Sequence, residues 1–390
     1  MTAMRLITYT NLFPDPSQPR HGVFVRERLE QLVRAPGVSA NVIAIRPGVK
    51  SGDVSKSKNG GPTPVTYHSV PNLPGISNWV DPLIWARWST SVVRDTIGND
   101  RDNVILDAHF LYPDGVAATL IGNALGIPVV LTARGSDVNV KCANPVMRSW
   151  IKWSAARSAG LITVSRALRD KLQSFGVHCR RTCVIPNGVD LSRFQPRDRE
   201  SSRAQLGVSG ELLLSVGHLL PAKGHEWAIR ALSLLPDSHV VVVGEGPDRA
   251  RLTALAKEMG VTDRVTFVGA VDPDRMPALY TAADVLILAS EREGMPNVVL
   301  ESLACGTPVV ASDVGGIPEV ITSQIAGRVL GDCNEATIAD AVKACRTSEM
   351  SRESVREFAQ QFDWHSRISA QIEFYEDVLA AGRQRSRAYG

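Results

Sequence analysis

The feature that most constrains the fold of this chain is a regular alternation of short apolar runs with longer segments of helical pattern. Runs such as ANVIAI (40–45) and HVVVVGEG (239–246) are rich in β-branched residues, and helix-like residues follow each one. Strands this apolar are typical of a parallel sheet covered by helices on both faces. We expect such strands at 5–10, 40–45, 103–110, 127–133, 160–165, 182–188, 212–217, 239–246, 264–270, 284–290 and 307–313.

The alternation occurs twice, which predicts two doubly wound α/β domains. A chain of 390 residues is also too long to fold around a single hydrophobic core of ordinary size. The polar, aperiodic segment 190–203 indicates the boundary. We therefore expect an N-terminal domain over 1–195 and a C-terminal domain over 204–365. An amphipathic helix over 366–381 closes the chain, and 50–64 is expected to be a surface loop.

The composition is that of an ordinary soluble protein, with 44% hydrophobic and 21% charged residues. No apolar run approaches the ~20 residues that a membrane helix needs, and the opening segment 1–14 favours a first strand over a signal peptide. The six cysteines form no CxxC pair, which favours reduced structural thiols over disulfides or a metal site. We expect a cytoplasmic protein that holds no metal.

The charge is unevenly distributed along the chain. Residues 1–200 carry 25 Lys and Arg against 15 Asp and Glu, so their net charge is +10, and the remainder carries −7. A basic first half indicates an anionic surface or substrate. The basic residues are dispersed and no nucleic-acid module is present, so nucleic acid is not expected as a partner.

Two segments combine tryptophan with basic residues. Such combinations favour contact with an anionic membrane, and the alternative is that these are core tryptophans with separate surface charges. The segments contain Trp79, Trp85 and Trp88 with Arg87 and Arg94, and Trp150 and Trp153 with Arg148 and Lys152.

Polar residues follow several of the predicted strands. In open parallel sheets, ligands bind beyond the carboxyl ends of the strands. The residues at these ends are His109, Arg134 to Asp137, Gly217 with His218, Gly244 to Gly246, and Glu291 with Glu293. We expect the two rims to face each other across a cleft.

The segment SVGHLLPAKG (215–224) has the composition of a diphosphate site. A strand ends near Gly217, a helix follows Gly224, and Lys223 lies at the turn. Amide groups at a helix start together with an ammonium group attract phosphate. The alternative is a glycine cap with a solvated lysine. For Gly244 and Gly246 in GEGPDR, the alternative to ligand contact is a tight strand-to-helix turn.

Glu301 is the only charged residue from Gly294 to Ser312. An ionised carboxylate in apolar surroundings is costly unless a hydrogen-bond donor satisfies it. The fold supplies that donor or a ligand brings one, and the vicinal diol of a nucleotide ribose offers two hydroxyl groups.

The residues before Glu301 suit contact with the same ligand. Pro296 and Asn297 fit the first turn of a helix, and Gly294 permits close approach of the backbone. Free amide groups around Met295 are then available to phosphate or sugar, while Glu293 can accept from sugar hydroxyls.

The segment EGMPNVVLE (293–301), followed by SLACGTPVVASDVGGIPEVI, resembles the E-x7-E segment of retaining glycosyltransferases of family 4. SVGHLLPAKG, GEGPDR, VTFVGAV, PNGVD and TARGSD also occur in the order of that family. The resemblance implies the GT-B fold, in which two Rossmann-like domains face each other. It also implies that the C-terminal domain holds the nucleotide-sugar, that the N-terminal domain holds the acceptor, and that the closing helix crosses back to the first domain.

The resemblance also implies roles for individual residues. Glu301 is expected on the ribose, and Glu293 on the transferred sugar. Catalytic roles fall to Lys223, His218 and Glu293. Binding of the nucleotide-sugar falls to Gly217, Gly244, Gly246, Gly294, Met295, Pro296, Asn297 and Glu301. Acceptor binding falls to Gly22, His109, Arg134 and Asp137.

The chain departs from the family pattern at two places. His218 stands where the family commonly has Arg, and because a histidine is only partly charged at neutral pH, Lys223 neutralises more of the diphosphate. Arg134 stands where the family often has His. Arg134 either binds an acceptor phosphate or carboxylate or forms a salt bridge with Asp137. His109 likewise either contacts the acceptor or caps its strand, and Gly22 matches a loop that is richer in glycine in the family.

The reaction implied is retaining transfer of a hexosyl-type sugar from a UDP- or GDP-type nucleotide-sugar, without cofactor or metal. The expected acceptor is a hydroxyl group of a polyprenyl-linked glycan in cell-envelope or exopolysaccharide synthesis, at the inner face of the membrane. The alternatives are a sugar-phosphate synthase with a small soluble acceptor and a non-catalytic subunit that binds nucleotide-sugar. The presence of Lys223, Glu293 and Glu301 argues against the last.

Overall fold

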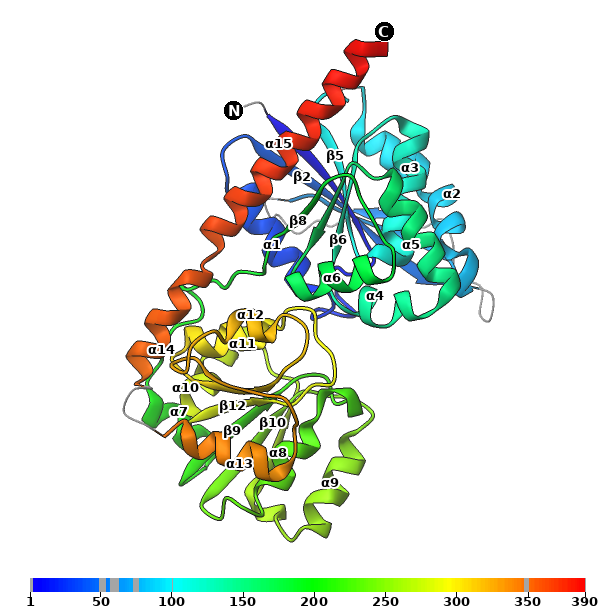
Figure 1. The fold of residues 1–390 in the computed structure, drawn as a ribbon. Helices are drawn as coiled ribbons and strands as arrows, with labels where there is room; N and C mark the ends of the chain where they lie inside the picture. The colour runs from blue at the N-terminus through cyan, green and yellow to red at the C-terminus, as the bar shows by residue number, and fades with distance from the viewer. Residues whose placement is uncertain are drawn as a thin grey trace. The chain divides into compact units, whose positions relative to one another are not determined.

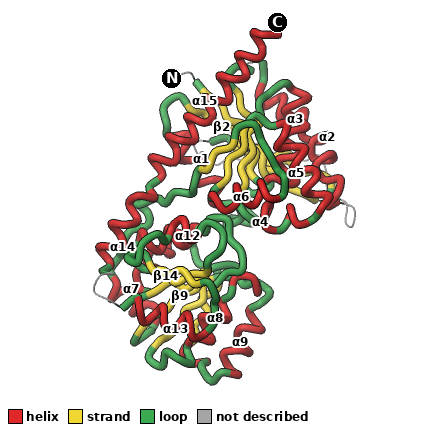
Figure 2. Tube along the Cα trace, in the orientation of Figure 1, coloured by secondary structure: helices red, strands yellow, loops and turns green. Residues whose placement is uncertain are grey.

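A computed structural model of the chain describes residues 3–48, 54–56, 63–72, 77–99, 101–346 and 351–389 (Figure 1). It divides into two compact units. Unit 1 comprises Met1–Pro186 and His365–Gly390, and unit 2 comprises Asn187–Trp364. In each unit the strands lie at the centre and helices surround them (Figure 2). The predicted class of two doubly wound α/β domains is confirmed.

Unit 1 is built on an eight-stranded sheet with the order β3-β4-β2-β1-β5-β6-β7-β8. Its strands are parallel except at the edge, where β3 pairs antiparallel with β4. The strands are β1 (Met4–Thr10), β2 (Val38–Gly48), β3 (Val54–Lys56), β4 (Val65–Pro71), β5 (Val104–His109), β6 (Val129–Ala133), β7 (Gly160–Thr163) and β8 (Thr182–Val184).

Two neighbouring strands at one edge of the unit 1 sheet, β3 and β4, were not predicted. β4 reads VTYHSVP and is only partly buried, so its pattern lacks the apolar run that marks the central strands. β3 lies within 50–64, which was expected to be a loop, and this part of the expectation is wrong. Of that segment the structure describes 54–56 and 63–64, and the remainder lies outside the described residues.

The helices of unit 1 cover both faces of its sheet (Figure 1). Helices α2, α3 and α5 pack together on one face, and α1 and α15 lie on the other. The bounds are α1 (Val23–Val33), α2 (Ser77–Ile97), α3 (Val116–Leu125), α4 (Ser136–Asn139), α5 (Pro145–Arg157), α6 (Arg166–Ser174) and α15 (Trp364–Tyr389), with short turns at Leu111–Gly115 and Lys141–Ala143. The closing helix therefore returns to the first unit, as predicted, and buries Tyr375 and Val378 there.

Unit 2 contains a six-stranded, wholly parallel sheet with the order β11-β10-β9-β12-β13-β14. Its strands are β9 (Glu211–Val216), β10 (Ser238–Val243), β11 (Val265–Gly269), β12 (Val285–Leu288), β13 (Val309–Ser312) and β14 (Gly327–Leu330). Its helices are α7 (Arg199–Leu206), α8 (His225–Ala231), α9 (Arg249–Glu258), α10 (Met276–Ala282), α11 (Asn297–Ala304), α12 (Ile317–Val320), α13 (Glu335–Ala344) and α14 (Arg352–Ala359). Strand β14 was not predicted because GRVL is short and partly polar.

The strand order places a topological switch point in each sheet. In unit 1 the chain leaves β1 for β2 and later returns to the other side of β1 as β5. In unit 2 it leaves β9 for β10 and returns beside β9 as β12. Ligands of such sheets bind beyond the carboxyl ends of the strands that flank the switch point. These ends are followed by the segments that the sequence analysis selected.

Within the described ranges, no helix has both the length and the apolar character needed to cross a membrane.

Candidate functional site

The turn that follows β9 in unit 2 is shaped by glycines. A Cβ atom at Gly224 would lie 1.9 Å from the carbonyl oxygen of Ala289, and one at Gly244 would lie 1.9 Å from that of Gly217. Any side chain at either position would therefore displace the backbone. Leu219 N–H also donates to Glu245 O at 2.8 Å. The turns after β9, β10 and β12 are thus held in direct backbone contact at one edge of the sheet.

Two of the predicted catalytic side chains meet at this edge. Lys223 ends a short 3-10 turn (Pro221–Lys223), and Glu293 follows β12. The Lys223 Nζ to Glu293 Oε1 distance is 2.6 Å, and the side chains are 30% and 10% exposed. His218 is exposed on the same turn. The site therefore has an ammonium group, a carboxylate and an imidazole close to solvent.

The start of α11 offers backbone donors beside this pair. Pro296 is the N-cap and Asn297 the first helical residue, so the helix starts within one position of the expected start. In the described contacts, the N–H groups of Gly294, Met295 and Asn297 donate to no other atom of the chain. Amide groups left open at a helix start attract phosphate and carboxylate groups.

Asn187, which sequence reasoning did not select, holds this turn in place. Its Nδ2 donates to Met295 O at 3.2 Å and to Asn297 Oδ1 at 2.8 Å. In the sequence, Asn187 stands out only as part of the segment PNGVD (186–190), which does not indicate a contact with Met295 or Asn297.

The fold itself supplies a hydrogen-bond donor to Glu301. The hydroxyl of Tyr280, on α10, donates to Glu301 Oε2 at 2.7 Å. Burial, followed by the nearby Glu301 carboxylate, raises the pKa of Tyr280 well above its ordinary value, so this hydroxyl stays protonated. The carboxylate is half-buried. Tyr280 was not predicted, because nothing in the spacing of MPALYTAAD points to a partner on the next helix.

In unit 1, two buried polar side chains lie near the carboxyl end of β5, where Asp107 is within the strand and His109 is its last residue. His109 Nε2 lies 2.8 Å from Asp107 Oδ2, and Arg134 Nη2 lies 2.7 Å from His109 Nδ1. A guanidinium group can only donate, so Nδ1 accepts and Nε2 carries the proton that is donated to Asp107. Burial lowers the pKa of His109, in agreement with a neutral ring. The His109 side chain is 2% exposed, and because its Nδ1 accepts from Arg134, the imidazole ring orients the guanidinium group.

Asp137 shapes the turn that carries Arg134. Its buried carboxylate accepts backbone N–H groups from Leu111, Arg134, Gly135 and Val138 at 2.8 to 3.1 Å. Burial raises the pKa of Asp137 above its ordinary value. The main chain of Arg134 is thus tied to Asp137, while its side chain reaches His109. Gly22 immediately precedes α1.

The buried network extends into the closing helix. Tyr375 Oη donates to Asp107 Oδ1 at 3.0 Å, Gln371 Nε2 donates to Tyr375 Oη at 2.5 Å, and Arg28 Nε donates to Gln371 Oε1 at 2.5 Å. All four side chains are fully buried. Sequence reasoning predicted the closing helix but selected none of these four side chains.

The tryptophan segments differ from the predicted membrane surface in one respect. Trp85 is 2% exposed and belongs to the core, so it cannot contact a membrane. Trp79 and Trp88, also on α2, are 57% and 41% exposed. Trp150 and Trp153 are partly buried and pack edge to face, with ring centroids 5.8 Å apart.

The described residues contain no group of three or more His, Cys, Asp or Glu side chains placed to hold a metal ion. The six cysteines are free thiols.

Comparison with known proteins gives two family matches that together span most of the chain. Residues 21–193 match Glycosyltransferase Family 4, and residues 197–362 match Glycosyl transferases group 1.

Individual proteins extend these matches. The putative teichuronic acid biosynthesis glycosyltransferase TuaC of Bacillus subtilis is 31% identical over 335 residues, or 80% of this chain and 82% of that protein. D-inositol 3-phosphate glycosyltransferase of Mycolicibacterium gilvum is 35% identical over 52% of this chain, and the match spans about half (48%) of that protein. The structure of Anabaena HepE in complex with UDP-glucose superposes with a TM-score of 0.76 at 18% identity, covering 96% of this chain and 100% of HepE.

Proposed function

Since the chain belongs to glycosyltransferase family 4 and has the GT-B fold, we propose that it transfers a hexosyl-type sugar from a nucleoside-diphosphate sugar with retention at the anomeric carbon. The observation that carries this proposal lies at the carboxyl ends of the unit 2 strands. The Lys223–Glu293 pair and the open amide groups at the start of α11 lie there, and half-buried Glu301 follows on the same helix.

Lys223, His218 and the amide groups of Gly294, Met295 and Asn297 are the groups that would hold the diphosphate. In the reaction the anomeric carbon–oxygen bond to the diphosphate breaks, a bond to the acceptor hydroxyl forms, and the acceptor proton passes to the departing phosphate oxygen. Negative charge grows on the leaving group, and preorganised cationic and amide donors aimed at such charge lower the barrier most. The reaction proposed needs no metal and no cofactor.

Glu301 and Glu293 would select the nucleoside and the sugar. Tyr280 holds one oxygen of Glu301, and this contact fixes the carboxylate so that ribose hydroxyls can donate to it. Glu293 is paired with Lys223 at 2.6 Å. A diphosphate would compete for the ammonium group, and Glu293 would then accept hydrogen bonds from sugar hydroxyls. The complex of HepE with UDP-glucose supports a UDP-type nucleotide, and a GDP-type nucleotide is the alternative.

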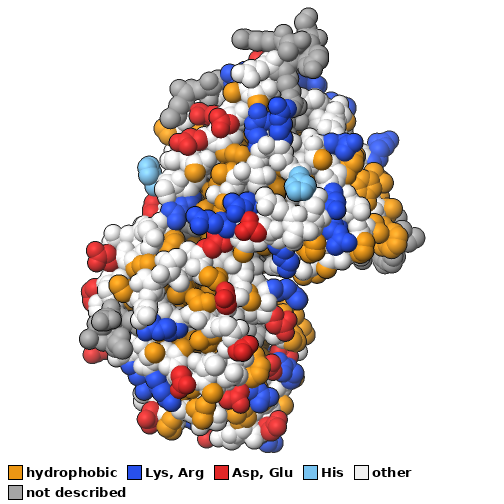
Figure 3. All heavy atoms as spheres, in the orientation of Figure 1, with side chains coloured by type: hydrophobic (Ala, Val, Ile, Leu, Met, Phe, Trp, Pro, Cys, Tyr) orange, Lys and Arg blue, Asp and Glu red, His pale blue; other side chains and the backbone are white. Residues whose placement is uncertain are grey.

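For the acceptor we propose a polyprenyl-linked glycan in cell-envelope or exopolysaccharide synthesis. The similarity to a teichuronic acid biosynthesis enzyme supports this class. On the face shown in Figure 3, Lys and Arg side chains are numerous on unit 1, which agrees with the +10 charge of residues 1–200. Helix α2 also exposes Trp79, Leu83 and Trp88. These features support peripheral contact with the inner face of an anionic membrane.

The membrane contact is tested by cosedimentation with liposomes that contain anionic lipid. We expect binding that falls with rising salt and that weakens in a Trp79→Ser/Trp88→Ser variant. Trp150→Ser serves as a control for loss of a partly buried tryptophan elsewhere. Absence of binding at low salt would rule the contact out without affecting the proposed reaction.

A second candidate acceptor is a small phosphorylated molecule. Arg134 favours it, because His109 and the turn shaped by Asp137 orient a guanidinium group at the carboxyl end of β6. The name of the D-inositol 3-phosphate glycosyltransferase relatives supports the same chemistry. A non-catalytic role is the third candidate, and the Lys223–Glu293 pair argues against it.

The proposed nucleotide site is tested by a thermal-shift panel of UDP, GDP, ADP and their sugars, because a ligand that binds the folded state raises the melting temperature. We expect one nucleotide to give a clearly larger shift, and Glu301→Ala to abolish that shift. Equal and negligible shifts across the panel would refute the site.

A further inference from the structure

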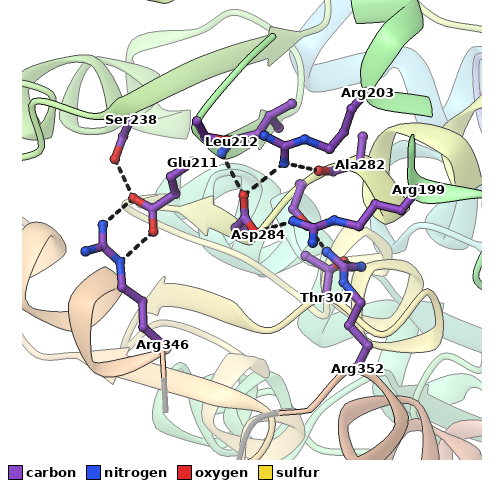
Figure 4. Close-up of polar contacts among 12 residues, drawn as sticks. Arg199, Arg203, Glu211, Leu212, Ser238, Ala282, Asp284, Thr307, Arg346 and Arg352 are labelled. Atoms are coloured by element: carbon purple, nitrogen blue, oxygen red, sulfur yellow. Dashed lines mark hydrogen bonds and ion pairs between the residues drawn. The ribbon is translucent and has the colours of Figure 1, made fainter. Parts of the chain in front are cut away.

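Unit 2 contains a polar cavity at the opposite ends of its strands from the residues discussed above. Its volume is about 600 Å³, which is within the size range of small-molecule sites, and Figure 4 shows the polar contacts of its side chains. It lies at the amino ends of β9, β12 and β13, whereas the proposed nucleotide site follows the carboxyl ends of β9 and β12. Its charged lining residues are Arg199, Arg203, Glu211, Asp284, Arg346 and Arg352.

One arginine of this cavity is fully matched by an acid. Arg346 makes a bidentate ion pair with Glu211, with Nε–Oε1 and Nη2–Oε2 distances of 2.7 and 2.6 Å. Ser238 also donates to Glu211. Figure 4 shows Arg346 turned toward Glu211. This pair contributes no net charge.

Two of the other three arginines share the carboxylate of Asp284. Arg199 and Arg203 both donate to Asp284, Arg203 at 3.1 Å. Arg352 is close to Arg199 in Figure 4 but donates to neutral oxygens, Thr307 Oγ1 at 3.1 Å and the carbonyl of Ala283. Among the described residues that line the cavity, positive charge thus exceeds negative charge by two.

The excess positive charge contributes to a lowered pKa of Arg352. Burial, followed by repulsion from Arg199 and Arg203, lowers the pKa of Arg352 to about 10. The buried Nε of Arg199 donates to no atom in the described part of the chain. Arg352 is partly buried, and its described contacts are to neutral oxygens. Because withdrawing a guanidinium group from solvent without a counter-ion is costly, ion pairing that serves only to connect strands and helices would be expected to balance its charges.

We propose that this cavity binds a small molecule through a phosphate group, at a site separate from the proposed nucleotide site. Guanidinium groups match phosphate oxygens with paired hydrogen bonds, and several arginines around one cavity are typical of phosphate recognition. A phosphate dianion would neutralise the two excess charges and accept from the Nε of Arg199 and from further N–H groups of the guanidinium groups around it. The carboxylate of Asp284 accepts from both Arg199 and Arg203 and so orients their guanidinium groups.

The proposal is tested by calorimetric titration of the full chain with pyrophosphate and, in a second arm, with inorganic phosphate, at low chloride concentration. The Lys223→Ala variant provides the background, so that binding at the nucleotide site is suppressed. We expect saturable binding in the Lys223→Ala background. Arg199→Gln, a substitution of a partly exposed residue, should weaken it by about tenfold, and Arg199→Gln/Arg203→Gln should weaken it further.

Lys343→Gln is the matched control, because it removes the same charge from α13, and Lys343 does not line the cavity. It should leave the affinity unchanged. Melting temperatures and the UDP thermal shift of the arginine variants, measured in the otherwise native chain, show that the fold and the nucleotide site are intact. Lack of saturable binding in the Lys223→Ala background, or equal affinity with and without Arg199, would overturn the proposal. Either result would leave the proposed glycosyl transfer unaffected.

Discussion

The polar residues at the carboxyl ends of the two sheets are held in opposite ways. In unit 1, His109 and Asp137 are 2% and 0% exposed and are satisfied by neighbours in the fold. In unit 2, Lys223 is 30% exposed, and the amide groups before α11 have no acceptor in the described contacts. The first arrangement preorganises one guanidinium group, and the second leaves donors available to a ligand. Substitutions in unit 1 should therefore affect stability, and substitutions in unit 2 should affect binding and turnover.

The largest effect is expected from Lys223→Ala in unit 2. Loss of the ammonium group removes charge stabilisation of the leaving diphosphate and should lower kcat for nucleotide-sugar turnover by about 10³. Lys223 is partly exposed, so the melting temperature should fall only modestly, through the loss of this partner for the Glu293 carboxylate. Lys257→Ala, on α9, is the control. A kcat within a few-fold of the native value would contradict the assigned role.

Glu301→Ala should weaken binding of the preferred nucleotide by about a hundredfold, because two hydrogen bonds to a charged acceptor are lost. Isothermal titration measures this loss. Tyr280→Phe sharpens the result, since it removes only the hydroxyl that fixes the carboxylate and should have a smaller effect. An unchanged nucleotide affinity in Glu301→Ala would contradict the proposed contact between Glu301 and the ribose.

Acidification tests a buried histidine beside the nucleotide site. Burial lowers the pKa of His225 to about 4, and its Nδ1 lies 2.8 Å from Ser215 Oγ. In the unfolded chain His225 therefore becomes protonated near pH 6.5, whereas in the folded chain it stays neutral until about pH 4. The contribution of His225 to stability is present above pH 6.5 and falls as the pH drops toward 4, by about 2 kcal/mol between pH 7 and 5.

Denaturant titration at these two pH values measures the change in the free energy of unfolding. His225→Asn should remove this contribution, which is read as the difference between the variant and the native chain. The lowered pKa of His109 acts in the same direction as His225, and the pKa of Asp114, which burial raises to about 8, acts in the opposite direction in both proteins. An identical slope in His225→Asn would show that His225 is not the group responsible.

The smallest effect is expected from Tyr375→Phe in the buried network of unit 1. Loss of the hydroxyl leaves Asp107 Oδ1 and Gln371 without this partner and should lower the free energy of unfolding by about 1–2 kcal/mol. Nucleotide binding should be unchanged, which is the reverse of Glu301→Ala. Phe374→Leu, on the same helix, controls for loss of packing. A reduced nucleotide affinity in Tyr375→Phe with native stability would contradict the comparison.

Sequence reasoning was most successful where a feature is local in the chain. Each predicted strand has a counterpart in the structure, because an apolar run and its turn residues lie within a few positions of each other. The helix start at Pro296 and Asn297 was found for the same reason. Strands β4 and β14 were missed, because strands near a sheet edge are only partly buried and carry a weaker apolar pattern.

Contacts between distant positions could not be predicted. Asn187 bonds across 110 positions to Asn297, and Tyr375 bonds across 268 positions to Asp107. The arginines of the proposed phosphate cavity come from α7, α14 and the segment after α13. They meet only because β9, β12 and β13 are neighbours in the sheet. The sequence by itself determined the class of fold, the family and the segments that reach the sheet edges, since periodicity and short motifs are local. Only the tertiary structure decided which side chains satisfy one another and which stay available, because hydrogen bonding and burial depend on neighbours that chain order does not specify.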